Sequence, residues 1–85
     1  MDALVSEHGG AVELEHILAG CGIKGIHRCQ DWGMAVLSVR AEITVWARRH
    51  GFMLTTPCTG NAWYPLWDVT EVAEVIMRCH EELEA

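Results

Sequence analysis

The residues with the greatest chemical capacity in this chain are four cysteines and five histidines. A structural zinc site usually contains a close cysteine pair such as Cys-x2-Cys, and the sequence has none. The nearest combinations are His27 with Cys29 and Cys79 with His80. Adjacent residues on a helix point about 100° apart, which makes Cys79 and His80 poor joint ligands. The sequence therefore predicts no metal site.

Catalytic chemistry is no better supported by the residue pattern. A cysteine nucleophile beside a histidine could be drawn from the same residues, but nothing fixes a base, an orienting group or an oxyanion pocket. The glycine-rich segment from Gly20 to Gly25 lacks the spacing of a phosphate-binding loop, and no clear strand precedes it. We therefore expect a binding protein, with no enzymatic activity and no cofactor.

Length and composition indicate a single domain over residues 1–85. A chain of this size buries only about 60–65% of its unfolded surface, so its core must be dense, and a 51% hydrophobic content with four tryptophans meets that need. No apolar run is long enough to span a membrane and no signal peptide is present, so we expect a cytoplasmic protein. Its cysteines are then expected to be thiols that pack as small buried residues. Residues 1–10, which end in two glycines, are expected to be a mobile leader.

Two helices can be predicted from apolar periodicity. Apolar positions at helical spacing begin at Ala11 and stop before Gly20, which predicts a helix over residues 11–20. Asp68 and Glu71 have the spacing of a capping box ahead of an apolar stripe. This pattern predicts a second helix over residues 69–83.

A β-hairpin is predicted over residues 52–67. Two short runs of strand-forming residues flank the turn-rich segment Pro57-Cys58-Thr59-Gly60-Asn61. Pro65 cannot donate a hydrogen bond to a neighbouring strand, so the second strand is expected to be an edge strand or to end early.

The segment before the hairpin has two interpretations. Read with a period of two, its apolar residues alternate as in a half-buried strand: Val39, Ala41, Ile43 and Val45. If the segment is instead read with a helical period, Val36, Val39, Ile43 and Trp46 lie on one apolar face, and Gly51 occupies the position of a helix C-cap. We favour the helix because it covers a longer window, with Asp31 as a helix N-cap further upstream, although residues 36–47 remain open to either structure. The expected fold class is α+β, a small and mainly helical domain with one β-hairpin.

A longer pattern joins these elements. The stretch Trp46-Ala47-Arg48-Arg49-His50-Gly51-Phe52 is followed by Gly60 and then by Trp63-Tyr64-Pro65-Leu66-Trp67-Asp68-Val69. This order resembles the winged helix-turn-helix domains of the MerR and phage-excisionase kind, over roughly half of the chain. The resemblance implies a small DNA-binding regulatory or accessory protein from a phage or other mobile element, with one helix set in the major groove of double-stranded DNA.

Charge is distributed unevenly in this chain of net charge −6. Residues 2–15 carry four acids and no Lys or Arg, and residues 68–84 carry six acids and one Arg. Residues 24–49 carry five Lys or Arg and two acids, an asymmetry that either orients the domain toward a polyanion or belongs to an ordinary solvated surface. The candidate DNA-binding residues are Lys24, Arg28, Arg40, Arg48 and Arg49.

A second hypothesis is an acidic protein–protein interaction module or inhibitor that binds a host protein or a basic surface. Strand alternation would put Trp63 and Trp67 on one face of the hairpin and Tyr64 on the other, and aromatic residues left outside the core suit a protein partner. Trp46 is expected to belong to the core. Either function is compatible with a homodimer, because regulators often bind paired half-sites and a small chain gains core by associating.

Overall fold

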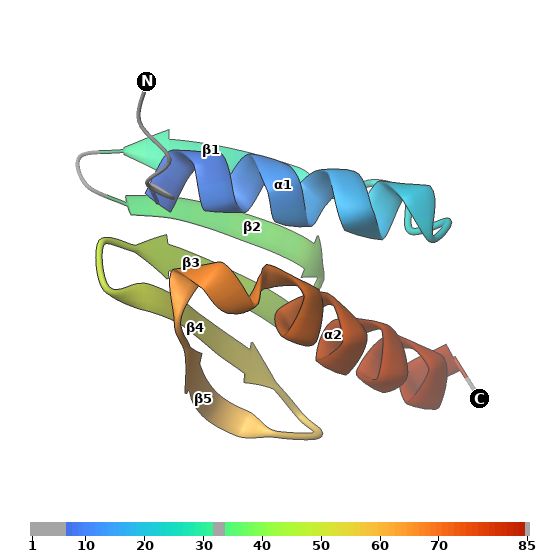
Figure 1. The fold of residues 1–85 in the computed structure, drawn as a ribbon. Coiled ribbons are helices and arrows are strands. Elements are labelled where there is room, and N and C mark those ends of the chain that lie inside the picture. The colour runs from blue at the N-terminus through green and yellow to red at the C-terminus, as the bar shows by residue number, and fades with distance from the viewer. Residues whose placement is uncertain (1–6, 32–33, 85) are drawn as a thin grey trace.

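The structure is a computed structural model that describes residues 7–31 and 34–84. Two helices pack on one antiparallel sheet in which every strand pairs with its neighbours in the chain (Figure 1). In chain order the elements are α1 (Glu7–Gly20), β1 (His27–Asp31), β2 (Met34–Arg40), β3 (Ile43–Arg48), β4 (Gly51–Thr56), β5 (Gly60–Tyr64), the 3-10 turn η1 (Leu66–Asp68) and α2 (Val69–Glu84).

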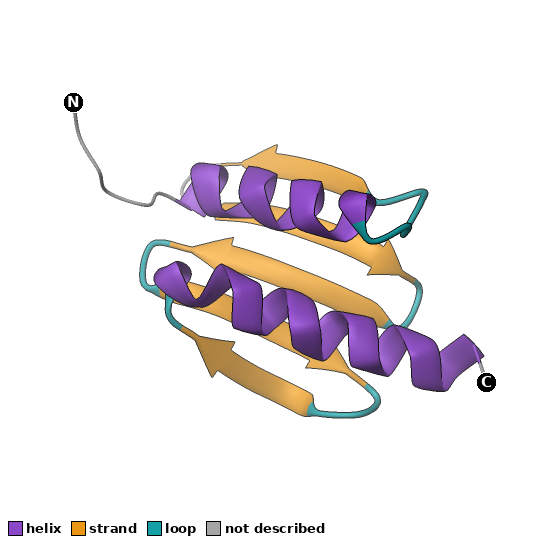
Figure 2. Ribbon diagram, turned by 45° about the vertical axis from the view of Figure 1, so that its right-hand side comes forward, coloured by secondary structure: helices purple, strands orange, loops and turns teal. Residues whose placement is uncertain are grey.

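Both helices lie on the same face of the sheet and run in the same direction (Figures 1 and 2). Helix α1 packs on β2 and β3, and α2 packs on β4 and on α1. The core fills the space between the helices and the sheet, and its largest fully buried side chains are Phe52, Leu14, Leu18, Leu37, Ile43, Leu54 and Ile76. Within residues 7–31 and 34–84, no helix covers the opposite face of the sheet.

Residues 36–47 lie in two strands, so the helix favoured from the sequence is wrong. Burial alternates along both strands, and the buried members are Ala35, Leu37, Val39, Ile43, Val45 and Ala47. The tight turn between Arg40 and Ile43 leaves the buried Val39 and Ile43 four positions apart in the sequence. Residues four positions apart also share one face of a helix. The turn therefore imitates helical spacing, while the β-branched residues of the segment favour strands.

The expected fold class is also wrong, because the chain forms a five-stranded sheet with two helices rather than a mainly helical domain with one hairpin. The hairpin predicted over residues 52–67 is present as β4 and β5, but it is one part of the larger sheet. Strand β5 is an edge strand that ends at Tyr64, directly before Pro65, as that proline indicated.

The two predicted helices are confirmed with small differences in their bounds. Helix α1 begins at Glu7, so residues 7–10 of the expected leader are helical, and residues 1–6 lie outside the described residues. Helix α2 covers the segment predicted from the capping box. Asp31 ends β1 instead of capping a helix, because β1 pairs with β2 up to Met34.

Two glycines permit close packing that a larger residue would prevent. A Cβ atom on Gly10 of α1 would lie 3.0 Å from Cζ of the buried Phe52. A Cβ atom on Gly51, the first residue of β4, would overlap the backbone carbonyl oxygen of Tyr64 at the end of β5. Because backbone cannot move aside as a flexible side chain can, Gly51 determines how closely β4 and the end of β5 approach.

We expect Gly51→Ala to lower the free energy of unfolding by about 2 kcal/mol or more, the range in which overpacking against fixed atoms falls. Thermal and urea unfolding followed by circular dichroism would measure the change. The matched control is Gly20→Ala at the end of α1, where no heavy atom lies within 4 Å of the added Cβ. The control should not lower stability, because alanine is favoured over glycine in a helix, and equal effects of both substitutions would contradict the packing role of Gly51.

Candidate interaction surfaces

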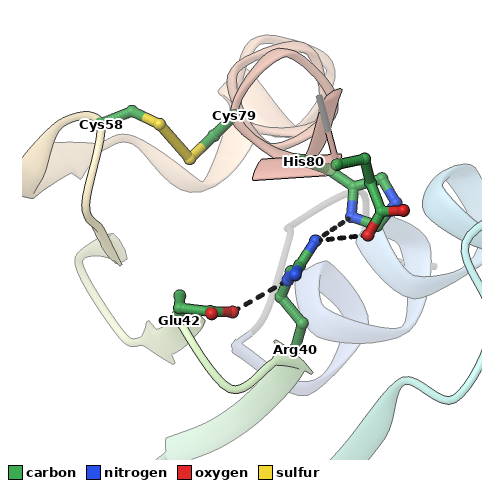
Figure 3. A network of polar contacts seen from close by, with 6 residues as sticks. Arg40, Glu42, Cys58, Cys79 and His80 are labelled. Carbon is green, nitrogen blue, oxygen red and sulfur yellow. Dashed lines mark hydrogen bonds and ion pairs between the residues drawn. A yellow bond between two sulfur atoms is a disulfide. The ribbon is translucent and has the colours of Figure 1, made fainter. Parts of the chain in front are cut away.

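Arg40, one of the candidate DNA-binding residues, contacts α2 in the structure (Figure 3). A break in the β2–β3 register between Ser38 and Arg40 re-aims its side chain. Its guanidinium donates hydrogen bonds of 2.9 Å to Glu42 and to Glu84, and it lies 3.4 Å from Nδ1 of His80. The hydrogen bond to Glu42, with a smaller contribution from Glu84, raises the pKa of Arg40. This arginine therefore joins the β2–β3 turn to the carboxyl end of α2.

The five candidate cations do not form one surface. Nε of Arg28 donates to Glu15 of α1 at 2.7 Å, so this side chain also makes an intramolecular ion pair. Arg48 and Arg49 are exposed at the β3–β4 turn. Lys24 and Arg40 lie at the opposite end of the sheet, because the register places the start of β1 beside the end of β2.

A disulfide bond connects Cys58 in the β4–β5 turn to Cys79 of α2 (Figure 3). Their Cα atoms are 6.0 Å apart, which is a usual separation for bonded cysteines. Oγ1 of Thr56 accepts hydrogen bonds from the backbone N–H groups of Cys58 and Thr59, which fixes the turn that presents Cys58. The expectation of four buried thiols is wrong, because this pair is bonded and only Cys79 is buried, while Cys21 and Cys29 are exposed free cysteines.

The aromatic candidates occupy three different environments. Trp63 on β5 and Trp67 in η1 are 58% and 77% exposed, whereas Tyr64 is half-buried and packs against the core. Trp63 and Tyr64 face opposite sides of the sheet as alternation predicted, but Trp67 lies beyond the strand. Trp46 was expected in the core and is instead half-buried on the uncovered face, because β3 directs its buried residues toward the helices.

The uncovered face of the sheet carries two rows of side chains in cross-strand register, one residue from each strand. The first row is mainly apolar and consists of Cys29, Val36, Trp46, Met53 and Trp63. The second is polar and consists of His27, Ser38, Thr44, Thr55 and Asn61. We name them the apolar row and the polar row. The period-two reading of residues 36–47 was the signal that could have located both rows.

The helix layer contains a groove between α1 and α2 that the sequence did not indicate. It encloses about 310 Å³ and is lined by Ile17, Cys21, Thr70, Ala73, Glu74, Met77, Arg78 and Glu81. The α2 residues recur every three or four positions and so share one helix face. Only the pairing of the two helices in space brings Ile17 of α1 and Cys21, which directly follows α1, to the same groove as these α2 residues.

No protein-family model matches the chain, and no curated protein or solved structure matches it. None of the helices within the described residues is long and apolar enough to cross a membrane. Within residues 7–31 and 34–84, no three or more His, Cys, Asp or Glu side chains gather closely enough to hold a metal ion.

Reduction of the Cys58–Cys79 disulfide is expected to lower the free energy of unfolding by about 3 kcal/mol, because the bond closes a loop across a sequence separation of 21. Urea unfolding with and without dithiothreitol would measure the difference. The double variant Cys58→Ala/Cys79→Ala should be insensitive to reductant, whereas Cys21→Ser should keep the full shift. An unchanged midpoint in reduced wild-type protein would contradict a stabilising role of the bond.

Proposed function

We propose that this protein is an acidic protein-interaction module that binds a basic amphipathic segment of a partner protein in the groove between α1 and α2. One observation carries the proposal: an apolar floor formed by Ile17, Ala73 and Met77 is bordered by the carboxylates of Glu74 and Glu81. Apolar side chains of a bound segment would be buried on this floor, and flanking Lys or Arg side chains would meet the acidic border.

The charge of the helix layer supports a basic partner. Arg78 is the only Lys or Arg in either helix, and it lies between Glu74 and Glu81 on the groove face of α2. Glu13 on α1 is exposed and lies one turn before Ile17, which adds a further carboxylate on the α1 side. Such a field attracts a cationic segment and accelerates its association.

The size of the groove favours the side chains of a protein segment over a drug-sized molecule. A volume of about 310 Å³ is at the lower end for small-molecule sites, which span roughly 300–1,000 Å³. The side chains around the floor come from two parallel helices, so the groove is elongated along them. A helical segment could therefore place successive apolar residues along it, in the manner of other helix-in-groove interactions.

A DNA-binding function has less support than protein binding. It depended on a helix over residues 36–47 that would enter the major groove, and these residues form β2 and β3. Arg28 and Arg40 are paired with carboxylates, and Arg40 and Arg48 lie at opposite ends of the sheet. The basic residues therefore present no continuous surface for a phosphate backbone.

The test is a fluorescence anisotropy titration with a labelled amphipathic helical peptide made of Leu and Lys, beside a matched peptide made of Leu and Glu. We expect only the Leu/Lys peptide to bind. Glu74→Lys should weaken its binding about tenfold, because one attractive contact is replaced by a repulsive one. Glu71→Lys makes the same charge change on the same helix outside the groove lining, and it should have a clearly smaller effect.

Met77→Gln tests the apolar floor separately and should also weaken binding while circular dichroism remains unchanged. Equal binding of the two peptides, or equal effects of Glu74→Lys and Glu71→Lys, would show that the groove is not the binding site. Labelled duplex DNA in the same assay should not bind. Salt-dependent DNA binding that Arg48→Ala abolishes would favour the nucleic-acid function instead.

A further inference from the structure

We propose that two copies of this chain pair through their uncovered sheet faces, with a two-fold axis that runs parallel to the central strand β3. This inference is independent of the groove in the helix layer, because it rests on the opposite face of the sheet. It depends on the apolar row and the polar row, which are defined by the strand register.

The apolar row has a gradient of side-chain size that suits a second copy. It begins with Cys29 and Val36 on β1 and β2 and ends with Met53 and Trp63 on β4 and β5. Rotation about an axis parallel to β3 places β1 of one copy over β5 of the other. The large Trp63 then lies over the small Cys29 of the second copy, and Trp46 meets its own counterpart at the centre, where two aromatic rings can stack.

The same rotation also matches polar groups with polar groups, because it preserves position along the strands. His27 then lies over Asn61 of the second copy, and Ser38 lies over Thr55. The alternative two-fold axis lies in the plane of the interface and runs perpendicular to the strands. It would keep the apolar row in contact with the apolar row of the second copy. It would place the polar row over the end of the second sheet that carries Met34 and Arg48. The two axes therefore predict different contacts.

The area of the face suits a reversible pair. Five strands about 4.8 Å apart and about six residues long cover roughly 24 by 20 Å, which is close to 500 Å² of flat surface per copy. Two copies together bury about 1,000 Å² before the relief of the side chains is counted, the lower limit for a biological interface. The two exposed or half-buried tryptophans on this face, Trp63 and Trp46, are the residue type most enriched among the strong contacts of interfaces.

Sedimentation equilibrium over a range of protein concentrations tests the pairing. We expect a dimer, and we expect Trp46→Thr to raise its dissociation constant at least tenfold, because a central aromatic contact is lost. The matched control is Trp67→Thr, which removes a more exposed tryptophan outside the sheet and should leave the dimer unchanged. A wild-type protein that stays monomeric throughout, or equal effects of the two substitutions, would overturn the proposal.

Cysteine cross-linking tests the direction of the axis. In a Cys21→Ser background, Trp63→Cys should link to Cys29 of the second copy through a short bismaleimide that spans the about 10 Å between packed sheets. Without Trp63→Cys the same background should not cross-link, because the two Cys29 thiols lie at opposite edges of the dimer. Cross-linking through Cys29 alone would instead show the perpendicular axis and overturn the orientation that we propose.

Arg48 gives an additional readout of the same axis. It is exposed at the end of β3 and would lie beside Arg48 of the second copy at the border of the interface. Arg48→Gln should therefore tighten the dimer severalfold at low salt and have little effect at high salt, where the repulsion is screened. No effect at either salt concentration would contradict the parallel axis.

Discussion

The structure depends on one arrangement, which is that both helices of the described residues cover the same face of the five-stranded sheet. Burial of that face provides the core between the helices and the strands. Strands β2, β3 and β4 consequently have one side that belongs to the core and one side that faces away from the helices. The alternation of burial along β2, β3 and β4 is the direct result.

Strand register links the two faces of the sheet. The register that places Ala35, Ala47 and Phe52 together beneath the helices also places Val36, Trp46 and Met53 together on the other face. A shift of one residue would exchange the two sets, so the cost of exposing Phe52 also fixes the position of Trp46. The apolar row is therefore as well determined as the core itself.

The carboxyl end of α2 needs contacts beyond apolar packing. Glu81, Glu82 and Glu84 lie in its last turns, where negative charge opposes the helix dipole. The ion pair between Arg40 and Glu84 offsets part of this repulsion, and the disulfide at Cys79 holds the preceding turn to the β4–β5 connection (Figure 3). These two contacts retain the acidic end of α2 against the sheet.

Much of the local structure could be predicted from the sequence, and most of the errors came from one segment. The helix after Asp68 and the hairpin around Gly60 carry strong local signals, namely a capping pattern and turn residues. The helix predicted over residues 36–47 was wrong because a hairpin with a tight turn reproduces helical spacing. The winged-helix resemblance relied on that helix. The Cys58–Cys79 bond, the groove and the ion pairs of Arg28 and Arg40 all join residues distant in sequence, and spacing along the chain cannot reveal them.

The placement of both helices on one face also limits how the chain can assemble. A sheet with two uncovered faces could stack repeatedly, whereas this sheet offers one face, so pairing through it is isologous and closes at two copies. In such a pair the acidic helix layers form the two outer surfaces, where like charge opposes further stacking. The groove between α1 and α2 would then face outward on both sides, so the two-sided distribution of apolar and acidic residues accommodates self-association and partner binding without competition between them.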